Sequence, residues 1–198
     1  MQSDKMPATR AFCRCAGALY ILNKNMDSFV ALFRGINVGG RNVIPMKELA
    51  SLMEECGYEN IRTYIQGGNV VFNSKNIPNT EIEKLVEKKF GFKPEVLILS
   101  SKDLSQAIEN NPYSSVDGKL CHFYFCMSTP KSINTSKLKE LETASEEYFI
   151  KGKVFYLYAP VGIGRSKLAA GVESCLGILA VARNLNTVNK LSKMLENA

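Results

Sequence analysis

The sequence predicts an α+β protein of tandem ferredoxin-like character, in which the order β-α-β-β-α-β occurs twice. Two observations support this prediction. From residue 26 onward, short apolar strands alternate with amphipathic helices. Two hairpins, at 64–72 and 149–155, then occupy the same place in the two halves of that order. The chain of 198 residues, 45% hydrophobic and 22% charged, is long enough for one ordinary domain or two small ones.

The first unit begins with a continuous apolar strand at 28–33. After a glycine-rich loop, Pro45 suits the first turn of a helix whose apolar face repeats every three to four residues, and Gly57 ends it. Strands are predicted at 61–65 and 70–72. Gln-Gly-Gly-Asn joins them as a tight turn, because glycine permits positive φ angles there.

The second half of this unit follows the same logic. Thr80 and Glu83 form the pattern of a capping box, which predicts a helix that Gly91 ends. A strand follows at 94–99, and a short linking helix at 101–110 is closed by Pro112.

The second unit is predicted to repeat this order and to add a C-terminal helix. A turn of the sequence Lys-Gly-Lys joins its two hairpin strands. The predicted elements are a strand at 120–126, a helix at 136–144, hairpin strands at 147–150 and 154–158, a helix at 165–176, a strand at 178–182 and the final helix at 187–196.

These elements divide the chain into three parts. Residues 1–25 differ in composition from the rest, and we expect them to form a poorly ordered extension outside the fold, with no clean signal-peptide pattern. Residues 26–112 form the first unit with its linking helix, and residues 113–198 the second unit with the C-terminal helix.

Five stretches of the sequence resemble a known family: LFRGINVGGRN, IPMKELASLMEECGY, IRTYIQGGNVVFNS, GRSKLAAGVESCLG and ARNLNTVNKL. Together they are similar to the bacterial family known as domain of unknown function 1697, over residues 26–198. Family members usually have serine at the position of Gly67 and commonly tryptophan at the position of Leu185. The resemblance implies a soluble α+β fold of tandem ferredoxin-like type. It does not indicate an activity, because the family has none assigned.

The first candidate site joins the glycine-rich loop to the first hairpin. In this fold the loop and the hairpin leave the same end of the sheet, so Arg34 and Asn37 should face Gln66 and Asn69. Arginine provides a planar fork for phosphate or carboxylate. The loop lacks the Gly-Lys-Ser/Thr of a P-loop and the spacing of a dinucleotide fingerprint. A plain turn with Arg34 in a structural ion pair is the alternative, and direct catalysis a further one. The predicted ligand-binding residues here are Arg34, Asn37, Gly39, Gly40, Arg41, Gln66, Gly68 and Asn69.

The second candidate site lies where the helix at 165–176 begins and the last strand ends. Cations at a helix start oppose its dipole, which makes sense where an anion completes the site. Ser166 and Asn186 as ordinary helix caps are the alternative. The predicted residues here are Arg165, Ser166, Lys167, Arg183, Asn184, Asn186 and Thr187.

Other classes of function are poorly supported by composition. The net charge of +6 divides into +3 on residues 1–25 and +3 on the remainder, a weak indication of a nucleic-acid partner. Tyr124, Tyr156 and Tyr158 could stack RNA bases, although packing is the commoner role of a strand tyrosine. His122 is the single histidine, so a histidine-based metal site or triad is not expected, and no carboxylate pair suits hydrolysis. Six cysteines without a CxxC pair suggest reduced thiols in a cytosolic protein.

We therefore predict a cytoplasmic protein without a membrane span that binds an anionic small molecule, such as a nucleotide, at the glycine-rich loop. The competing hypotheses are a nucleic-acid-binding or protein-interaction module without catalysis, and an enzyme whose catalytic residues and cofactor the sequence does not identify.

Overall fold

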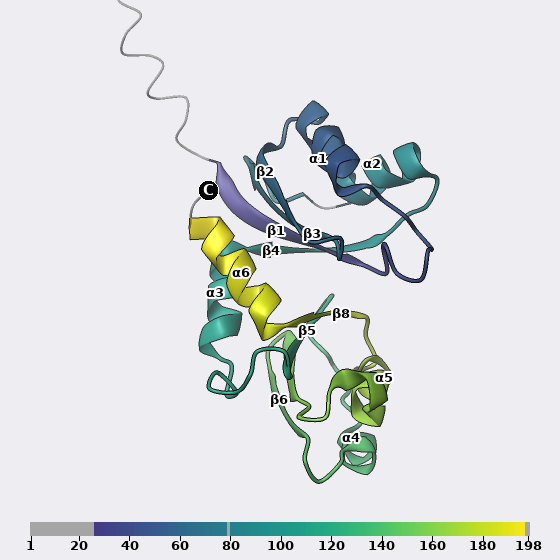
Figure 1. Ribbon diagram of the computed structural model, residues 1–198, viewed down its shortest axis with the longest axis vertical. Coiled ribbons are helices and arrows are strands. Elements are labelled where there is room, and N and C mark those ends of the chain that lie inside the picture. Colours follow the sequence, from purple (N-terminus) through teal and green to yellow (C-terminus); the bar gives the residue numbers. More distant parts are fainter. Residues whose placement is uncertain (1–25, 79, 197–198) are drawn as a thin grey trace, which may run out of the picture.

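The computed structural model describes residues 26–78 and 80–196, and contains in them two four-stranded antiparallel sheets and six α-helices (Figure 1). The α+β class and the repetition of one sheet-and-helix unit are therefore confirmed. The predictions made for residues 1–25 lie outside the described residues.

The first sheet has the strand order β2-β3-β1-β4. Its central strand β1 pairs with β3 on one side and with β4 on the other, both antiparallel. Helices α1 and α2 cover one face of this sheet (Figure 1). The bounds are β1 (Asp27–Arg34), α1 (Met46–Glu55), β2 (Glu59–Tyr64), β3 (Asn69–Ser74), α2 (Glu81–Phe90) and β4 (Glu95–Ser100).

The second sheet repeats this order as β6-β7-β5-β8, with α4 and α5 on its outer face. A short 3-10 helix, η1, precedes α5. The bounds are β5 (Cys121–Cys126), α4 (Thr135–Leu141), β6 (Glu147–Lys151), β7 (Val154–Tyr158), η1 (Ile163–Arg165), α5 (Lys167–Leu176) and β8 (Ala180–Asn184).

Two further helices, α3 (Ser101–Glu109) and α6 (Leu185–Glu196), contribute to a core that both sheets share. Strand β1 shows why its sequence is apolar without interruption. Phe29 and Phe33 face α1 and α2, whereas Val30 and Leu32 face the shared core. A strand buried on both faces needs apolar side chains at successive positions. The two units therefore meet through a hydrophobic layer that includes residues from both.

Local sequence signals were right about most elements, but the capping of α2 and the first residue of α5 differ from the prediction. Thr80 precedes α2, but its side chain makes no capping hydrogen bond, and Glu83 is buried at 9% exposure instead of reaching back. The capping box is found at α3, where Ser100 and Asp103 bond reciprocally. Arg165 belongs to η1, and α5 begins at Lys167 with Ser166 as its cap.

Candidate functional site

The glycine-rich loop and the first hairpin do lie together, as the topology predicted. Asn37 sits in the left-handed region, with φ of 56°. Its Nδ2 donates to the carbonyl oxygens of Ile44 (3.0 Å) and Gln66 (2.9 Å), and its Oδ1 accepts from the Ile44 amide (2.7 Å). These bonds tie the loop to the hairpin and to the start of α1. Because both ends of the Asn37 amide are engaged, its contacts here are structural.

Arg34 does not face Gln66 and Asn69, and that part of the predicted geometry is wrong. Its guanidinium instead makes a bidentate ion pair with Glu173 of α5, with Nη2–Oε2 at 2.7 Å and Nε–Oε1 at 3.2 Å. The same Oε1 accepts the amide of Ala180 at 2.8 Å. The two side chains keep exposed fractions of 39% and 32%. A carboxylate of the second unit thus occupies the fork that was predicted to hold a ligand anion.

Arg183 makes the second link between the units. From β8 its Nε donates to Oδ1 of Asn69 at 2.6 Å. Its Nη2 donates to the carbonyls of Phe33 (2.8 Å), Gly67 (2.9 Å) and Gly68 (3.3 Å), and its Nη1 to the carbonyl of Ala182. Burial lowers the pKa of Arg183 to about 10, so it stays protonated at neutral pH. Neutral oxygens, mostly of the first hairpin, satisfy this buried cation.

The glycines of this region differ in what they require. Gly68 has φ of +71°, and a Cβ there would lie 2.6 Å from Cβ of Phe33, so only glycine fits. Gly39 and Gly40 also have positive φ but face open space. Arg41 beside them is exposed. Of the residues predicted at this first site, Gly39, Gly40 and Arg41 lie open to solvent, and so does Gln66, whose backbone carbonyl alone takes part in the contacts described above.

The second predicted group consists mainly of helix caps. Ser166 Oγ accepts from the Ala169 amide (2.9 Å), and Asn184 Oδ1 accepts from the Thr187 amide (2.9 Å). Asn186 packs on Gly118, where an added Cβ would meet its Oδ1 at 2.2 Å. Arg165 and Lys167 are exposed near the start of α5. The guanidinium of Arg183, also in this predicted group, turns instead to the first unit. Ligand binding by either predicted group stays a prediction.

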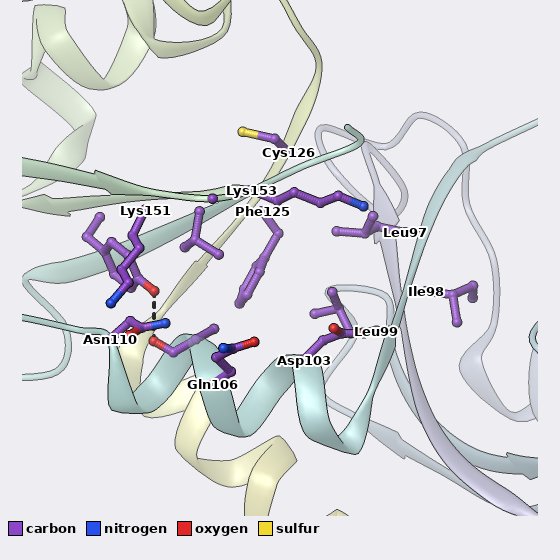
Figure 2. A pocket seen from close by; sticks show the side chains of 14 residues that line it. Leu97, Ile98, Leu99, Asp103, Gln106, Asn110, Phe125, Cys126, Lys151 and Lys153 are labelled. Atoms are coloured by element: carbon purple, nitrogen blue, oxygen red, sulfur yellow. Dashed lines mark hydrogen bonds between the residues drawn. The ribbon is translucent and has the colours of Figure 1, made fainter. Parts of the chain in front are cut away.

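A cavity of about 470 Å³ opens elsewhere between the two units (Figure 2). Strand β4 forms one wall, α3 a second, and the turn between β6 and β7 a third. Leu97, Leu99 and Val154 supply apolar surface, with the buried rings of Phe125 and Tyr156 behind them. The Tyr156 hydroxyl donates to the Ala107 carbonyl at 2.9 Å. This volume falls within the range of about 300–1,000 Å³ typical of small-molecule sites.

Polar groups stand around this apolar interior. Asp103, Gln106 and Asn110 lie along the face of α3 that is turned to the cavity (Figure 2). Lys151 and Lys153, both exposed, come from the β6–β7 turn. Sequence reasoning missed this site. Its one local indication was the Lys-Gly-Lys turn, which was interpreted only as a hairpin connection.

The two buried thiols of β5 favour their neutral forms. Burial raises the pKa of Cys121 and of Cys126 to about 11, and the hydrogen bond of Cys121 to Asn111 opposes this rise in part. Neither thiol is therefore an activated nucleophile. Tyr124 and Tyr156 are buried at 7% and 0% exposure, so they cannot stack a base. Within residues 26–78 and 80–196, no three His, Cys, Asp or Glu side chains gather closely enough to hold a metal ion.

Comparison with known proteins gives a family. Residues 26–156 match the family described as protein of unknown function (DUF1697). The chain belongs to this family. The resemblance seen in the sequence extends over residues 26–198, and the family match covers residues 26–156 of that range.

A solved structure extends the likeness to more of the chain. It is titled as the structure of conserved bacterial protein SP0830 from Streptococcus pneumoniae, and is 24% identical. The match covers 86% of this chain and 99% of that one, with a TM-score of 0.60. At this identity the likeness concerns the fold. No curated protein matches the chain. Among the described residues, no helix has the length and apolar character to cross a membrane.

Proposed function

We propose that this member of the DUF1697 family binds a small amphipathic anion, an apolar body bearing a carboxylate or phosphate, in the cavity between its two units. The observation that carries the proposal is the lining of the cavity. An apolar interior that includes Phe125 and Val154 stands beside the two exposed ammonium groups of Lys151 and Lys153. Ligand sites commonly combine such an apolar interior with a few polar groups that fix orientation.

The anion predicted from the sequence is thereby assigned to a different place. At the glycine-rich loop, Arg34 already pairs with Glu173, and Arg183 is surrounded by carbonyl oxygens. An anion at that loop would have to rely on Arg41 and the backbone around Gly39. At the cavity, neither lysine is drawn into a salt bridge in the part of the chain that the structure describes. The cavity therefore offers an anion the better site.

A binding titration followed by NMR tests the proposal. The probes are 4-phenylbutyrate and phenyl phosphate, which join an aromatic ring to an anion. We expect amide resonances of the β6–β7 turn and of α3 to shift. Lys153→Ala should weaken binding about fivefold, because one partly exposed ion pair contributes up to ~1 kcal/mol. Lys139→Ala serves as the matched control, since Lys139 is an exposed lysine of the same unit outside the cavity.

Two results would contradict the proposal. One is the absence of resonance shifts with either probe at millimolar concentration. The other is binding that Arg41→Ala weakens and Lys153→Ala leaves unchanged, which would return the site to the glycine-rich loop.

The same proposal includes two broader inferences. We infer that each unit is ferredoxin-like, since each has the order β-α-β-β-α-β with its first strand at the centre of an antiparallel sheet. We also infer a cytosolic protein. Its support is that Cys56, Cys121, Cys126 and Cys175 are all free thiols.

A further inference from the structure

We propose that the ligand of this cavity is a short peptide that adds to the free edge of β4 as an antiparallel strand, with its carboxylate at Lys153 and its amino terminus at Asp103. This inference rests on the proposed function, because it names the chemical class that the cavity takes. Four observations support it: an open strand edge, its contact with the cavity, a gradient of charge along it, and amide side chains opposite.

The first observation is the direction of the backbone groups of β4. This strand is the last in its sheet and pairs only with β1. The amide of Phe33 donates to Gly68 on the β3 side of β1, at 2.8 Å. Backbone groups alternate between the two sides of an antiparallel strand. Leu32 and Val30 therefore point to β4, where they pair with Leu97 and Leu99.

It follows that Leu97 and Leu99 direct their N–H and C=O groups to β1, whereas Ile98 directs its own to the open edge. The amide of Ser100, the next group on that edge, donates to Oδ2 of Asp103 in the capping box at 3.1 Å. Ile98 thus offers one donor and one acceptor beyond the sheet. Such an edge is a ready template for another strand.

The second observation is that the cavity lies against this edge. Leu97, Ile98 and Leu99 all contribute to its wall. Successive strand side chains point to opposite faces of a sheet. Leu97 and Leu99 pack toward the core that both sheets share, whereas Ile98 packs toward the core between the first sheet and its helices α1 and α2. A cavity that touches three consecutive residues must therefore contact the strand along its edge. Extended peptides bind proteins at such edges through main-chain hydrogen bonds.

The third observation is the polarity of charge along the edge. Figure 2 shows Asp103 beside Leu99, and the Lys153 side chain extending across the cavity toward Leu97. A peptide with free termini carries a positive amino end and a negative carboxyl end. With the amino end at Asp103 and the carboxyl end at Lys153, its chain runs opposite to β4. This direction is antiparallel, like every pairing in the sheet.

The fourth observation concerns the opposite wall. Gln106 and Asn110 present side-chain amides to the cavity from α3. An amide side chain both donates and accepts, as a peptide group does. The outward-facing peptide groups of an added strand would meet these side chains, while its inward-facing groups met Ile98. An aliphatic acid of the same size has no groups to match either wall, and this difference favours a peptide.

The decisive experiment compares the binding of peptides that differ from one another by a single functional group. The probe is the tripeptide Ala-Phe-Leu with free termini, alongside its two single N-methylated forms and its C-terminal amide. We expect at least one N-methylated form to bind about tenfold more weakly, because the methyl group blocks a strand hydrogen bond. Amidation should weaken binding to the native protein about fivefold and have no effect in Lys153→Ala.

Amide hydrogen exchange provides a readout on the protein itself. We expect the bound tripeptide to slow exchange of the Ile98 amide by about tenfold or more, because that amide gains an acceptor. Leu97 and Leu99 are internal controls, since their amides already bond to β1 and should change little. With 4-phenylbutyrate in place of the peptide, Ile98 should gain no protection.

The outcomes separate this inference from the proposed function. If 4-phenylbutyrate binds in the cavity while neither N-methylated form differs from the parent tripeptide by more than about twofold, the peptide inference is overturned and the proposed function stands. Unchanged exchange at Ile98 in the peptide complex would overturn the inference equally. If no probe binds, both fail.

Discussion

The link from Arg183 to the first hairpin provides the sharpest test of how the two units are held together. We choose Arg183→Met, which keeps an unbranched apolar side chain and removes every donor. In the native protein the guanidinium reaches the carbonyls of Phe33 and Gly67 and the Oδ1 atom of Asn69. Asn69 is fully buried, at 0% exposure, so its oxygen cannot turn to solvent when its donor is lost.

The size of the effect follows from those contacts. An acceptor left buried without a donor costs about 1–3 kcal/mol, and hydrogen bonds to a charged group contribute about 1.5–3 kcal/mol each. Against this, the substitution relieves the desolvation that lowers the pKa of Arg183 to about 10. With Asn69 and Phe33 as the acceptors most affected, we expect Arg183→Met to lower the free energy of unfolding by about 3 kcal/mol.

Urea denaturation followed by circular dichroism measures this change, and thermal unfolding checks it independently. A loss of ~3 kcal/mol corresponds to a fall in Tm of about 6–12 °C for a protein of this size. The stability of Arg183→Lys should lie between those of the native protein and Arg183→Met, since one ammonium group cannot reach all the acceptors that the planar guanidinium reaches. If Arg183→Met unfolds within ~0.5 kcal/mol of the native protein, the guanidinium is not the link that its geometry indicates.

Three further predictions test other parts of the protein. Gly68→Ala should lower the free energy of unfolding, measured by urea denaturation, by about 2–4 kcal/mol, because the new Cβ would meet the side chain of Phe33 and the backbone φ is positive. The control Gly67→Ala should change it by no more than ~1 kcal/mol. Arg34→Ala should lower the free energy of unfolding by at most ~1 kcal/mol, since its ion pair with Glu173 is partly exposed. Glu173→Ala should lower it by about 1–3 kcal/mol, because this carboxylate also accepts the amide at the start of β8. Equal losses in the two variants would contradict this assignment. Burial lowers the pKa of His122 from 6.5 despite a bond to a backbone carbonyl, so the unfolded state binds the proton more tightly. Stability should therefore fall as the pH drops below about 6.5, by up to ~1.4 kcal/mol per pH unit from this group, and that slope should shrink in His122→Asn.

The fold was predictable because its signals are local. The spacing of Leu49 and Met53 marks the buried face of α1, and an unbroken apolar run marks β1. Errors arose where two local patterns were alike. Thr80 and Glu83 carry the same capping pattern as Ser100 and Asp103, yet only the latter pair bonds. Glu83 lies instead at a buried position of α2, and tertiary packing decided between the two.

The candidate site was predictable only within one unit. The contact between Asn37 and Gln66 followed from the order of strands, and it is present. The partners of Arg34 and Arg183 lie 139 and 114 positions away, in the other unit. Such contacts depend on how two units pack, which no periodicity or turn pattern specifies. Nothing near Arg34 in the sequence indicates Glu173.

The chemistry of arginine explains why the sequence favoured a ligand at this loop. A planar guanidinium binds carboxylate and phosphate, and it donates equally well to backbone carbonyls. The sequence pattern of an arginine beside a glycine-rich loop is therefore the same whether the arginine binds a ligand or another part of its own chain. Glu173 and the hairpin carbonyls supply at Arg34 and Arg183 what an anion would have supplied.

The same packing accounts for the cavity. At β8 the second unit meets the first directly, through Arg183 and the end of β1. At β4 the two units meet across α3, and Gln106 and Ala107 of that helix contribute to the wall of the open space. Each lining residue has an ordinary local explanation, since Lys151 and Lys153 flank a hairpin turn and Gln106 lies on a helix surface. Because these residues converge beside the free edge of β4, they can contact one ligand together. For that reason the residues most conspicuous in the sequence hold the protein together, and inconspicuous ones form its better candidate for a binding site.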